Sequence, residues 1–289
     1  MKKLLIATTA LVATAGMAAA EVSLSGYAEM GIADAGGATG MEFHHDLDVK
    51  FSLSGETDNG LTFGATIDLD EVAGGIGANA GPHSVWIKGN FGSLTMGDTD
   101  GAFDWAMTEV AMLTSIADDH TAHAGYSGNG GLDGSNDGQV LRYDNTFGDF
   151  GVAVSYEMND AGAATGDALG LGVKYNADLG GAALALGLGY AKNDLTNSLG
   201  LSAKTSFSGV DVVVNYTDTD AGVTHTAIGL GYTTGDLSLT ANYGEFSTGA
   251  DGFGIAANYS LGGGATVMAG YGSSSTNIDT FSLGLGLSF

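Results

Sequence analysis

Apolar residues in this chain alternate, one by one, with small or polar residues along most of its length. Residues 43–54 show the pattern clearly, with Phe43, Leu47 and Phe51 on one set of alternate positions and Asp46 and Asp48 on the other. Successive side chains of an extended strand point to opposite faces, so a period of two predicts two-faced β-strands. Comparable segments recur at residues 22–32, 61–69, 150–158, 169–175, 184–190, 210–216, 228–232, 237–243, 253–259 and 281–289.

The second face of these segments separates a membrane barrel from a soluble sandwich. It carries Gly, Ala, Ser, Thr, Asn and occasional charges, whereas the first face is apolar and often ends in Tyr or Phe. A soluble sandwich strand would instead place large charged residues on its wet face. An apolar face with aromatic ends suits lipid, and a small, polar face suits a water-filled lumen. Backbone groups in hydrocarbon must all be paired internally, so the sheet must close.

Short and long connections alternate between the predicted strands. The short ones are 57–60, 92–93, 147–149, 208–209, 234–236 and 262–264, and they contain Asn-Gly or Gly-rich pairs typical of hairpin turns. The long, polar ones are 34–42, 71–82, 98–138, 159–167, 193–197, 218–225, 247–252 and 273–279. Turns on one rim and loops on the other are typical of outer-membrane barrels. We therefore predict an all-β, closed antiparallel transmembrane barrel of sixteen strands, with eight loops and seven turns, over residues 21–289.

The N-terminus predicts export from the cytoplasm. Lys2 and Lys3 precede an uncharged, apolar stretch at 4–17, and three alanines at 18–20 offer small residues to a signal peptidase. This is the layout of a secretory signal, and it is too short for a retained membrane helix. We expect residues 1–20 to be removed.

Charge and cysteine content exclude several classes of function. The chain has 8 basic and 33 acidic residues, a net charge of −25, and no cysteine. Without residues 1–20 the charge becomes −27, because 6 basic residues remain against 33 acidic ones. Nucleic-acid binding needs clustered Lys and Arg, so it is excluded. Disulfides and thiolate metal sites are excluded as well.

Three stretches in order along the chain resemble the general diffusion porins, and the Rhodobacter-type porins most closely. They are residues 21–26 (EVSLSG), 53–61 (LSGETDNGL) and 92–98 (GSLTMGD). Porins of that type also carry an acidic third loop and a terminal phenylalanine, here Phe289. The resemblance implies an outer-membrane homotrimer whose third loop folds into the lumen as a constriction. It also implies that Phe289 is a signal to the barrel-assembly machinery.

The long connection at 98–138 is the predicted constriction loop, since most loops have only about 4–6 residues. Helical spacing of its apolar residues predicts a short helix with one face packed on the barrel wall, formed by Phe103, Ala106, Met107, Val110 and Ala111. The acidic rim of the pore eyelet is predicted to comprise Asp104, Glu109, Asp118 and Asp119. The stretch 125–138 is interpreted as a flexible connection.

Basic wall residues are predicted to face these acids across the eyelet. Strand alternation directs Lys50, Lys88 and Arg142 into the lumen, and related porins place basic wall residues opposite the acidic loop. Lys174 and Lys204 also point inward, but no sequence feature places them in the eyelet. Facing charges order water and hinder apolar solutes. The net charge and the aspartates at 46, 48, 68 and 70 predict a weak cation preference.

The predicted function is passive diffusion of small hydrophilic solutes and ions, without catalysis. Two alternatives stay open: an outer-membrane barrel enzyme, and a structural or adhesive barrel with a plugged lumen. Zinc at His120 and His123 is disfavoured, and the loop carboxylates would suit calcium better because it prefers hard oxygen ligands; whether any metal binds is left unknown. Residues 71–82 are a candidate latch between subunits. Glycines such as Gly187 and Gly229 are interpreted as lumen-facing strand residues rather than as part of a nucleotide-binding loop.

Overall fold

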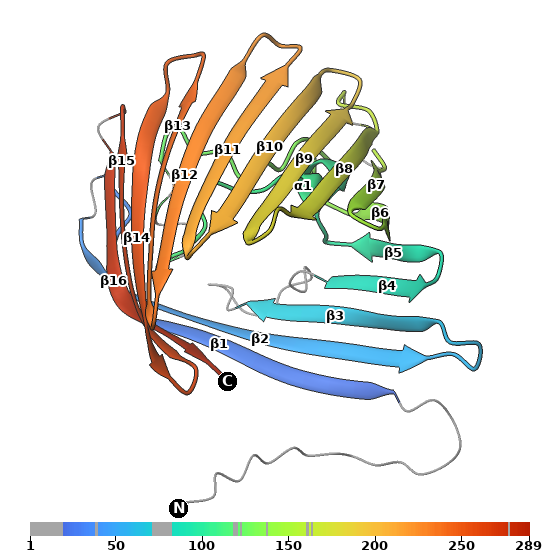
Figure 1. Cartoon of the computed structure of the whole chain (residues 1–289), viewed down its shortest axis with the longest axis horizontal. Coiled ribbons are helices and arrows are strands. Elements are labelled where there is room, and N and C mark those ends of the chain that lie inside the picture. Colours follow the sequence, from blue (N-terminus) through green and yellow to red (C-terminus); the bar gives the residue numbers. More distant parts are fainter. Residues whose placement is uncertain are drawn as a thin grey trace, which may run out of the picture.

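The chain forms a closed barrel of sixteen antiparallel strands, seen in a computed structural model. Consecutive strands are neighbours throughout, and β1 pairs with β16 to close the ring (Figure 1). The structure describes residues 20–37, 40–70, 83–117, 121, 123–136, 138–159, 162, 164–276 and 278–289. Several predicted features lie outside the described residues: positions 1–19 of the predicted signal segment 1–20, the candidate latch at 71–82, and Asp118, Asp119 and His120. The predicted fold class and strand number are confirmed.

The strands differ in length along the chain: β1 and β2 are the longest, with 14 and 15 residues, and β3 to β7 are the shortest. The first seven are β1 (Glu21–Asp34), β2 (Glu42–Glu56), β3 (Thr62–Asp70), β4 (His83–Gly89), β5 (Gly92–Gly97), β6 (Val140–Phe147) and β7 (Phe150–Glu157). The other nine are β8 (Ala168–Asp178), β9 (Ala182–Lys192), β10 (Asn197–Phe207), β11 (Val210–Thr219), β12 (Thr224–Thr234), β13 (Leu237–Phe246), β14 (Asp251–Gly262), β15 (Ala265–Ser274) and β16 (Asp279–Ser288).

The last residue of the chain takes part in closing the barrel. β1 and β16 are paired from Tyr27 opposite Ser288 to Asp34 opposite Phe281. Beyond this register, the backbone N–H of Phe289 donates to the carbonyl oxygen of Gly26 at 2.8 Å, and the Gly26 N–H returns a bond of 3.3 Å. The seam is therefore paired to its end, as a sheet in hydrocarbon requires.

The predicted turns occur where expected, with one displaced by two residues. Gly89 pairs directly with Gly92, so the turn between β4 and β5 consists of Asn90 and Phe91. Gly92 and Ser93, predicted to form that turn, instead begin β5. The prediction was wrong because it relied on Gly92, whose φ of +109° is adopted at the start of the strand.

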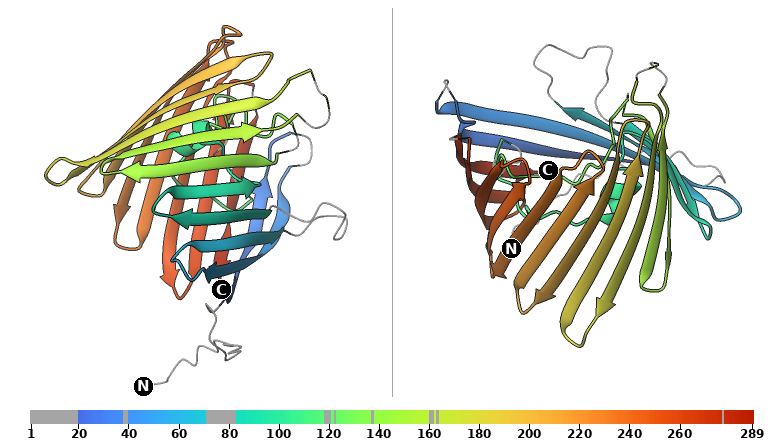
Figure 2. Two further views of the ribbon diagram at one scale, coloured as in Figure 1. Left: turned by 90° about the vertical axis from the view of Figure 1, so that its right-hand side faces the viewer. Right: turned by 90° about the horizontal axis from the view of Figure 1, so that it is seen from above.

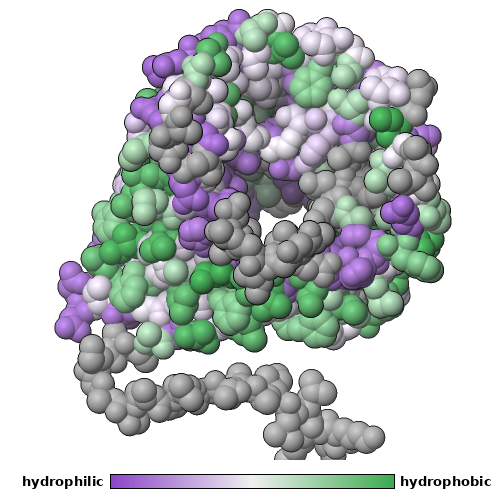
Figure 3. Space-filling model, turned by 180° about the vertical axis from the view of Figure 1, so that it is seen from behind, coloured by the Kyte–Doolittle hydropathy of each residue, from purple (hydrophilic) through white to green (hydrophobic). Residues whose placement is uncertain are grey.

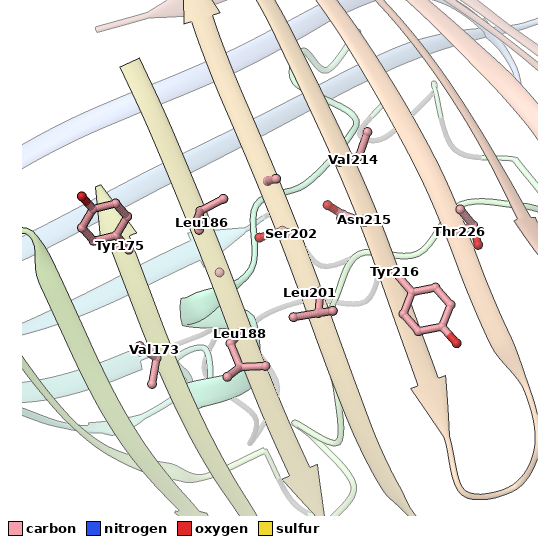
Figure 4. A pocket seen from close by; sticks show the side chains of 12 residues that line it. Val173, Tyr175, Leu186, Leu188, Leu201, Ser202, Val214, Asn215, Tyr216 and Thr226 are labelled. Carbon is pink, nitrogen blue, oxygen red and sulfur yellow. The ribbon is translucent and has the colours of Figure 1, made fainter. Parts of the chain in front are cut away.

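The outer face of the barrel is apolar, and the residues between the outward side chains point to the inside of the barrel. Val173, Leu188, Leu201 and Tyr216 lie side by side across four strands and are paired in register (Figure 4). They line a shallow groove of about 590 Å³. Along β12, buried residues alternate strictly with exposed ones from His225 to Tyr232. Figure 3 shows hydrophobic residues over much of the outer wall and hydrophilic ones beside an opening through the molecule.

The wall is not equally tall all the way round. β4 and β5 have 7 and 6 residues, whereas β8 to β16 have 10 to 12. At about 3.4 Å per residue and a tilt of about 40°, the short pair spans about 16–18 Å and the long strands about 26–31 Å. The lipid-facing band of such barrels is about 25 Å tall, so the short side does not span it.

The helical content of the described residues is one short element inside the ring. α1 (Ala102–Ala106) lies within the strands in Figure 1 and in both views of Figure 2. None of the helices in the described part of the chain has the length and apolar character of a membrane span.

The orientation of the two faces can be tested with one charged residue placed on either side. Leu201 lies in the middle of β10 and is 48% exposed. The substitution Leu201→Arg should lower the free energy of unfolding by about 2–4 kcal/mol, because the charge would enter lipid. Asn176→Arg on the inner face of β8 is the control and should change stability little. Urea unfolding in lipid bilayers measures both. Equal losses in the two variants would contradict the assignment of faces.

Candidate functional site

Residues 98–117 follow the inner wall from β7 across to β1. The backbone N–H of Ala102 donates to Ser155 Oγ on β7 at 2.8 Å, and that of Thr108 donates to Ser202 Oγ on β10 at 3.1 Å. Farther on, Ser115 Oγ accepts a 2.7 Å bond from the hydroxyl of Ser282 on β16. Small polar side chains of the wall thus supply the partners that an isolated loop would lack.

Where the loop reaches β1, it is hydrogen-bonded to the side chain of Glu29. Glu29 is 5% exposed, and its Oε2 accepts the backbone N–H of Ala117 at 2.7 Å. His44 Nε2 lies 3.0 Å from the same oxygen, and the Tyr27 hydroxyl donates to Oε1 at 3.0 Å. One buried carboxylate therefore ties β1, β2 and the loop together.

The chain then returns along the same wall to β7. His225 Nε2 on β12 lies 2.8 Å from the carbonyl oxygen of Gly125, and Asn215 Nδ2 on β11 donates to Asn129 Oδ1 at 3.2 Å. At the end of the return, the N–H groups of Asn136 and Gly138 donate to Glu157 Oε1 at 3.1 and 2.8 Å. The interpretation of 125–138 as a flexible connection was wrong, because its partners come from strands distant in the sequence.

Glycines on the wall allow this close approach. A Cβ atom on Gly172 would lie 2.1 Å from the carbonyl oxygen of Ala102, and one on Gly187 would lie 2.1 Å from that of Ala106. On β12, a Cβ on Gly229 would lie 2.2 Å from the carbonyl oxygen of Val110. Only a residue without a side chain lets the two backbones come so near. These three inward-facing glycines therefore form the surface against which the loop packs, and we refer to them as the glycine bed.

The predicted helix is real but shorter than expected. Phe103, Ala106, Met107 and Val110 are all buried, with exposures of 1 to 7%. The helix nevertheless ends at Ala106, and Met107 is extended, with φ −82° and ψ 159°. The next N–H, that of Thr108, bonds to the wall rather than continuing the helical series. Contact with the wall therefore buries the apolar residues beyond the helix.

Four acidic residues, three from the start of the loop and Asp133 from near its end, influence one another around α1. Burial, followed by repulsion from Asp100, Glu109 and Asp133, raises the pKa of Asp104 to about 7. Burial also raises the pKa of Asp133 to about 6, although the 2.6 Å bond that Asp133 Oδ2 accepts from the Gly101 N–H works against it. Asp104 is therefore partly protonated near neutral pH.

Two basic wall residues lie within electrostatic reach of these acids. Arg142 donates from Nη1 to the carbonyl oxygen of Asp100 at 2.6 Å and from Nε to Asp144 Oδ1 at 3.2 Å. Lys174 Nζ lies 4.2 Å from the centre of the Trp105 ring, and its charge opposes the rise in the pKa of Asp104. Aromatic rings attract cations placed over their faces.

The structure brings only some of the predicted eyelet residues together. Asp104, Glu109 and Arg142 belong to this electrostatic group. Lys50 and Lys88 lie on the same inner face by register but have other partners: Lys50 Nζ is 2.8 Å from Asp68 Oδ2, and Lys88 Nζ is 4.4 Å from the Trp86 ring centre. Their role in an eyelet stays a prediction. So does that of Asp118 and Asp119, which lie outside the described residues.

Sequence reasoning missed Asp100, Asp133, Lys174 and the anchor Glu29. Strand alternation did direct Lys174 inward. Lys174 joins the group because α1 packs against β7, β8 and β9. No feature of the sequence indicates where on the wall that helix packs.

Among the described residues, no group of three or more His, Cys, Asp or Glu side chains is arranged to hold a metal ion. His123 Nε2 lies 2.7 Å from Asn242 Oδ1, so this nitrogen is hydrogen-bonded to the wall, and His120 lies outside the described residues. Calcium on the loop carboxylates stays a prediction, since two of those carboxylates lie outside the described residues.

Comparison with known proteins places this architecture among channels. A sequence profile described as Gram-negative porin matches residues 7–279. A porin of Rhodobacter capsulatus is 28% identical over 287 residues, covering 86% of this chain and 93% of the relative. A solved porin structure superposes with a TM-score of 0.70 at 22% identity, and a triple mutant of the Rhodopseudomonas blastica porin with 0.73 at 19% identity. Each superposition covers 93% of this chain and 100% of the other.

The glycine bed can be tested by adding one methyl group. Gly229→Ala would force the backbone at Val110 away from the wall, so we expect a loss of about 1–3 kcal/mol in the free energy of unfolding. Amide hydrogen exchange of residues 108–117 should also become faster. Gly231→Ala is the matched control on the same strand, because its Cβ meets only the flexible end of Met112 at 3.1 Å and Asp211 Cβ at 3.3 Å. Equal protection of the loop in both variants would count against this docking.

The raised carboxyl pKa values predict that the folded state loses stability as pH rises. Both aspartates bind a proton more tightly in the folded chain than at the ordinary pKa of 3.8. Their contribution is therefore full below about pH 4 and is lost as pH rises through about 6 to 7. The urea midpoint in detergent should fall between pH 5 and pH 8. Asp104→Asn should reduce that fall. Asp220→Asn should not, because bonds from Thr196 and Asn197 lower the pKa of Asp220.

Proposed function

Because the chain belongs to the family of Gram-negative porins, and is therefore a channel of the bacterial outer membrane, we propose that residues 98–138 are its constriction. Small hydrophilic solutes and ions would diffuse passively through the space that this loop leaves open. The observation that carries the proposal is the path of the loop, which is bonded to the inner wall on its way from β7 to β1 and again on its return. A loop held at so many points narrows the lumen without needing to move.

Charge around the constriction supports a selectivity for hydrophilic solutes. Asp104 and Glu109 come from the loop, while Arg142 and Lys174 come from the wall. Opposed charges in a narrow, wet passage order water and favour solutes that can replace its hydrogen bonds. Apolar solutes meet a desolvation cost instead.

A weak preference for cations follows from the excess of acids. The whole chain has a net charge of −25, and Asp46, Asp48 and Asp68 lie on the inner face of β2 and β3. A negatively lined passage raises the local concentration of cations. The preference stays weak because burial leaves Asp104 only partly ionised near neutral pH.

A porin is a channel rather than an enzyme, and we infer further that the lumen of this one is not plugged. The structure supports this inference through the opening that passes through the molecule in Figure 3. A plugged structural barrel would leave no such passage, and a barrel enzyme would need a nucleophile and a base meeting at its rim.

We also propose that the chain works as a homotrimer, with the short wall turned toward its neighbours. β4 and β5 are too short to span the apolar layer of the membrane. Their outward side chains, such as Val85 and Met96, are 55 and 57% exposed in the single chain. A second copy placed against this side would cover the low wall with protein instead of lipid.

Conductance and ion selectivity in planar bilayers test the constriction. The double variant Asp104→Asn with Glu109→Gln should reduce the cation-to-anion permeability ratio by a factor of about 2 to 5, since each charge acts on a passing ion with about 0.5–1 kcal/mol in water. The control is Asp58→Asn with Asp236→Asn, two carboxyls at the turn rim, which should leave the ratio unchanged.

An unchanged ratio in the first variant would remove residues 98–138 from the selective part of the pore. The same recordings bear on the assembly, because the three pores of a trimer enter the bilayer together in one conductance step and should then close under voltage in three equal steps. Closure of each inserted unit in one step would contradict the trimer.

A further inference from the structure

A second cavity lies apart from the acidic cluster, between the returning loop and the wall. It has a volume of about 150 Å³ and sits at the loop-side ends of β10 to β13. The lining residues on which the argument rests are Phe103, Asn129, Ser198, Thr217, His225 and Phe246. It shares no residue with the acids and bases of the constriction.

The lining of this cavity contrasts with the chain as a whole, which carries a large negative net charge. None of its residues is Asp, Glu, Lys or Arg, although the chain has 33 acidic residues. Four hydroxyls and one amide offer neutral hydrogen bonds, and two phenylalanines offer apolar faces. Such a mixture fits a guest that has both hydroxyls and carbon, and it gives a charged guest no partner.

Three polar atoms in this lining have no hydrogen-bond partner among the described residues. They are Asn129 Nδ2, Thr217 Oγ1 and His225 Nδ1. Asn129 and His225 are each only 3% exposed. Buried polar groups are nearly always paired in native proteins, so three unpaired groups in the wall of one cavity are available to hydrogen-bond a molecule that enters it.

Surrounding contacts hold these groups in place. The His225 ring lies 4.5 Å from that of Phe246, and its Nε2 faces the Gly125 carbonyl oxygen at 2.8 Å. Asn129 accepts a 3.2 Å bond from Asn215 Nδ2, and its φ of +57° is one that asparagine adopts readily. The cavity is therefore built by the fold rather than left between mobile side chains.

We propose that this cavity binds a small, uncharged polyol of about the size of glycerol. A water molecule takes about 30 Å³ of liquid, so the volume admits about five waters or one solute of about six non-hydrogen atoms. Hydroxyl groups both donate and accept, and so can serve a histidine nitrogen, a threonine hydroxyl and an amide N–H together. The carbon backbone of the polyol would lie against Phe103 and Phe246.

Binding can be measured without relying on channel activity. The purified full-length protein in detergent, with histidine side chains labelled in ¹³C and ¹⁵N, is titrated with glycerol and followed by NMR. His225 is the histidine in the cavity lining, so its ring signals should shift and saturate in the millimolar range expected for so few atoms. The other histidines serve as internal references.

Two matched substitutions test the site. Thr217→Val keeps the shape but removes the hydroxyl, and it should weaken binding by about fivefold, the loss expected for one hydrogen bond. Thr240→Val removes an equally unpaired hydroxyl from the inner wall outside the cavity lining, and it should leave binding unchanged. Ser198→Leu should fill the cavity and abolish the shift.

A His225 shift that never saturates, or equal affinities for Thr217→Val and Thr240→Val, would overturn the proposal and leave a cavity filled only by water. Because no ion flow is measured, failure here is distinguishable from failure of the constriction, which rests on bilayer selectivity.

Discussion

The structure depends on the requirement that no backbone N–H or C=O group be left unpaired in hydrocarbon. A sheet can satisfy this only by closing, and here closure extends to the last residue, where Phe289 exchanges two backbone bonds with Gly26. Closure also divides every strand into an outward and an inward face. Leucines can then face lipid on the outer side, while serines and glycines on the inner side face the lumen.

The inward face has a second role that follows from its small residues. Glycine and serine leave space close to the wall and, in the case of serine, a hydrogen-bonding group. The loop uses both: its carbonyl oxygens lie over glycines such as Gly172 and Gly187, and its N–H groups bond to Ser155 and Ser202. A composition rich in glycine, which in another chain would suggest disorder, here builds a closely fitted inner layer.

These relations explain what could be predicted from the sequence. The strand period, the alternation of turns and loops and the inward direction of Lys50, Lys88 and Arg142 are local properties, and the register reproduces them. The path of the loop is not local. It depends on Glu29 and Glu157, which lie 88 and 19 residues from their loop partners Ala117 and Gly138. The same reason explains why the helix was predicted too long and why 125–138 was interpreted as flexible.

Docking the loop also decides the electrostatics of the passage. An aspartate on a free loop would be fully ionised, whereas Asp104, pressed toward the wall beside three other acids, retains its proton up to about pH 7. Lys174 and Arg142 partly offset this effect but do not abolish it. If residues 98–138 form the constriction, as proposed, the contacts that hold them to the wall also reduce the charge that the narrow part presents. Size and charge selectivity would then not be set independently in this barrel, since both would follow from how closely the loop packs on the inward glycines.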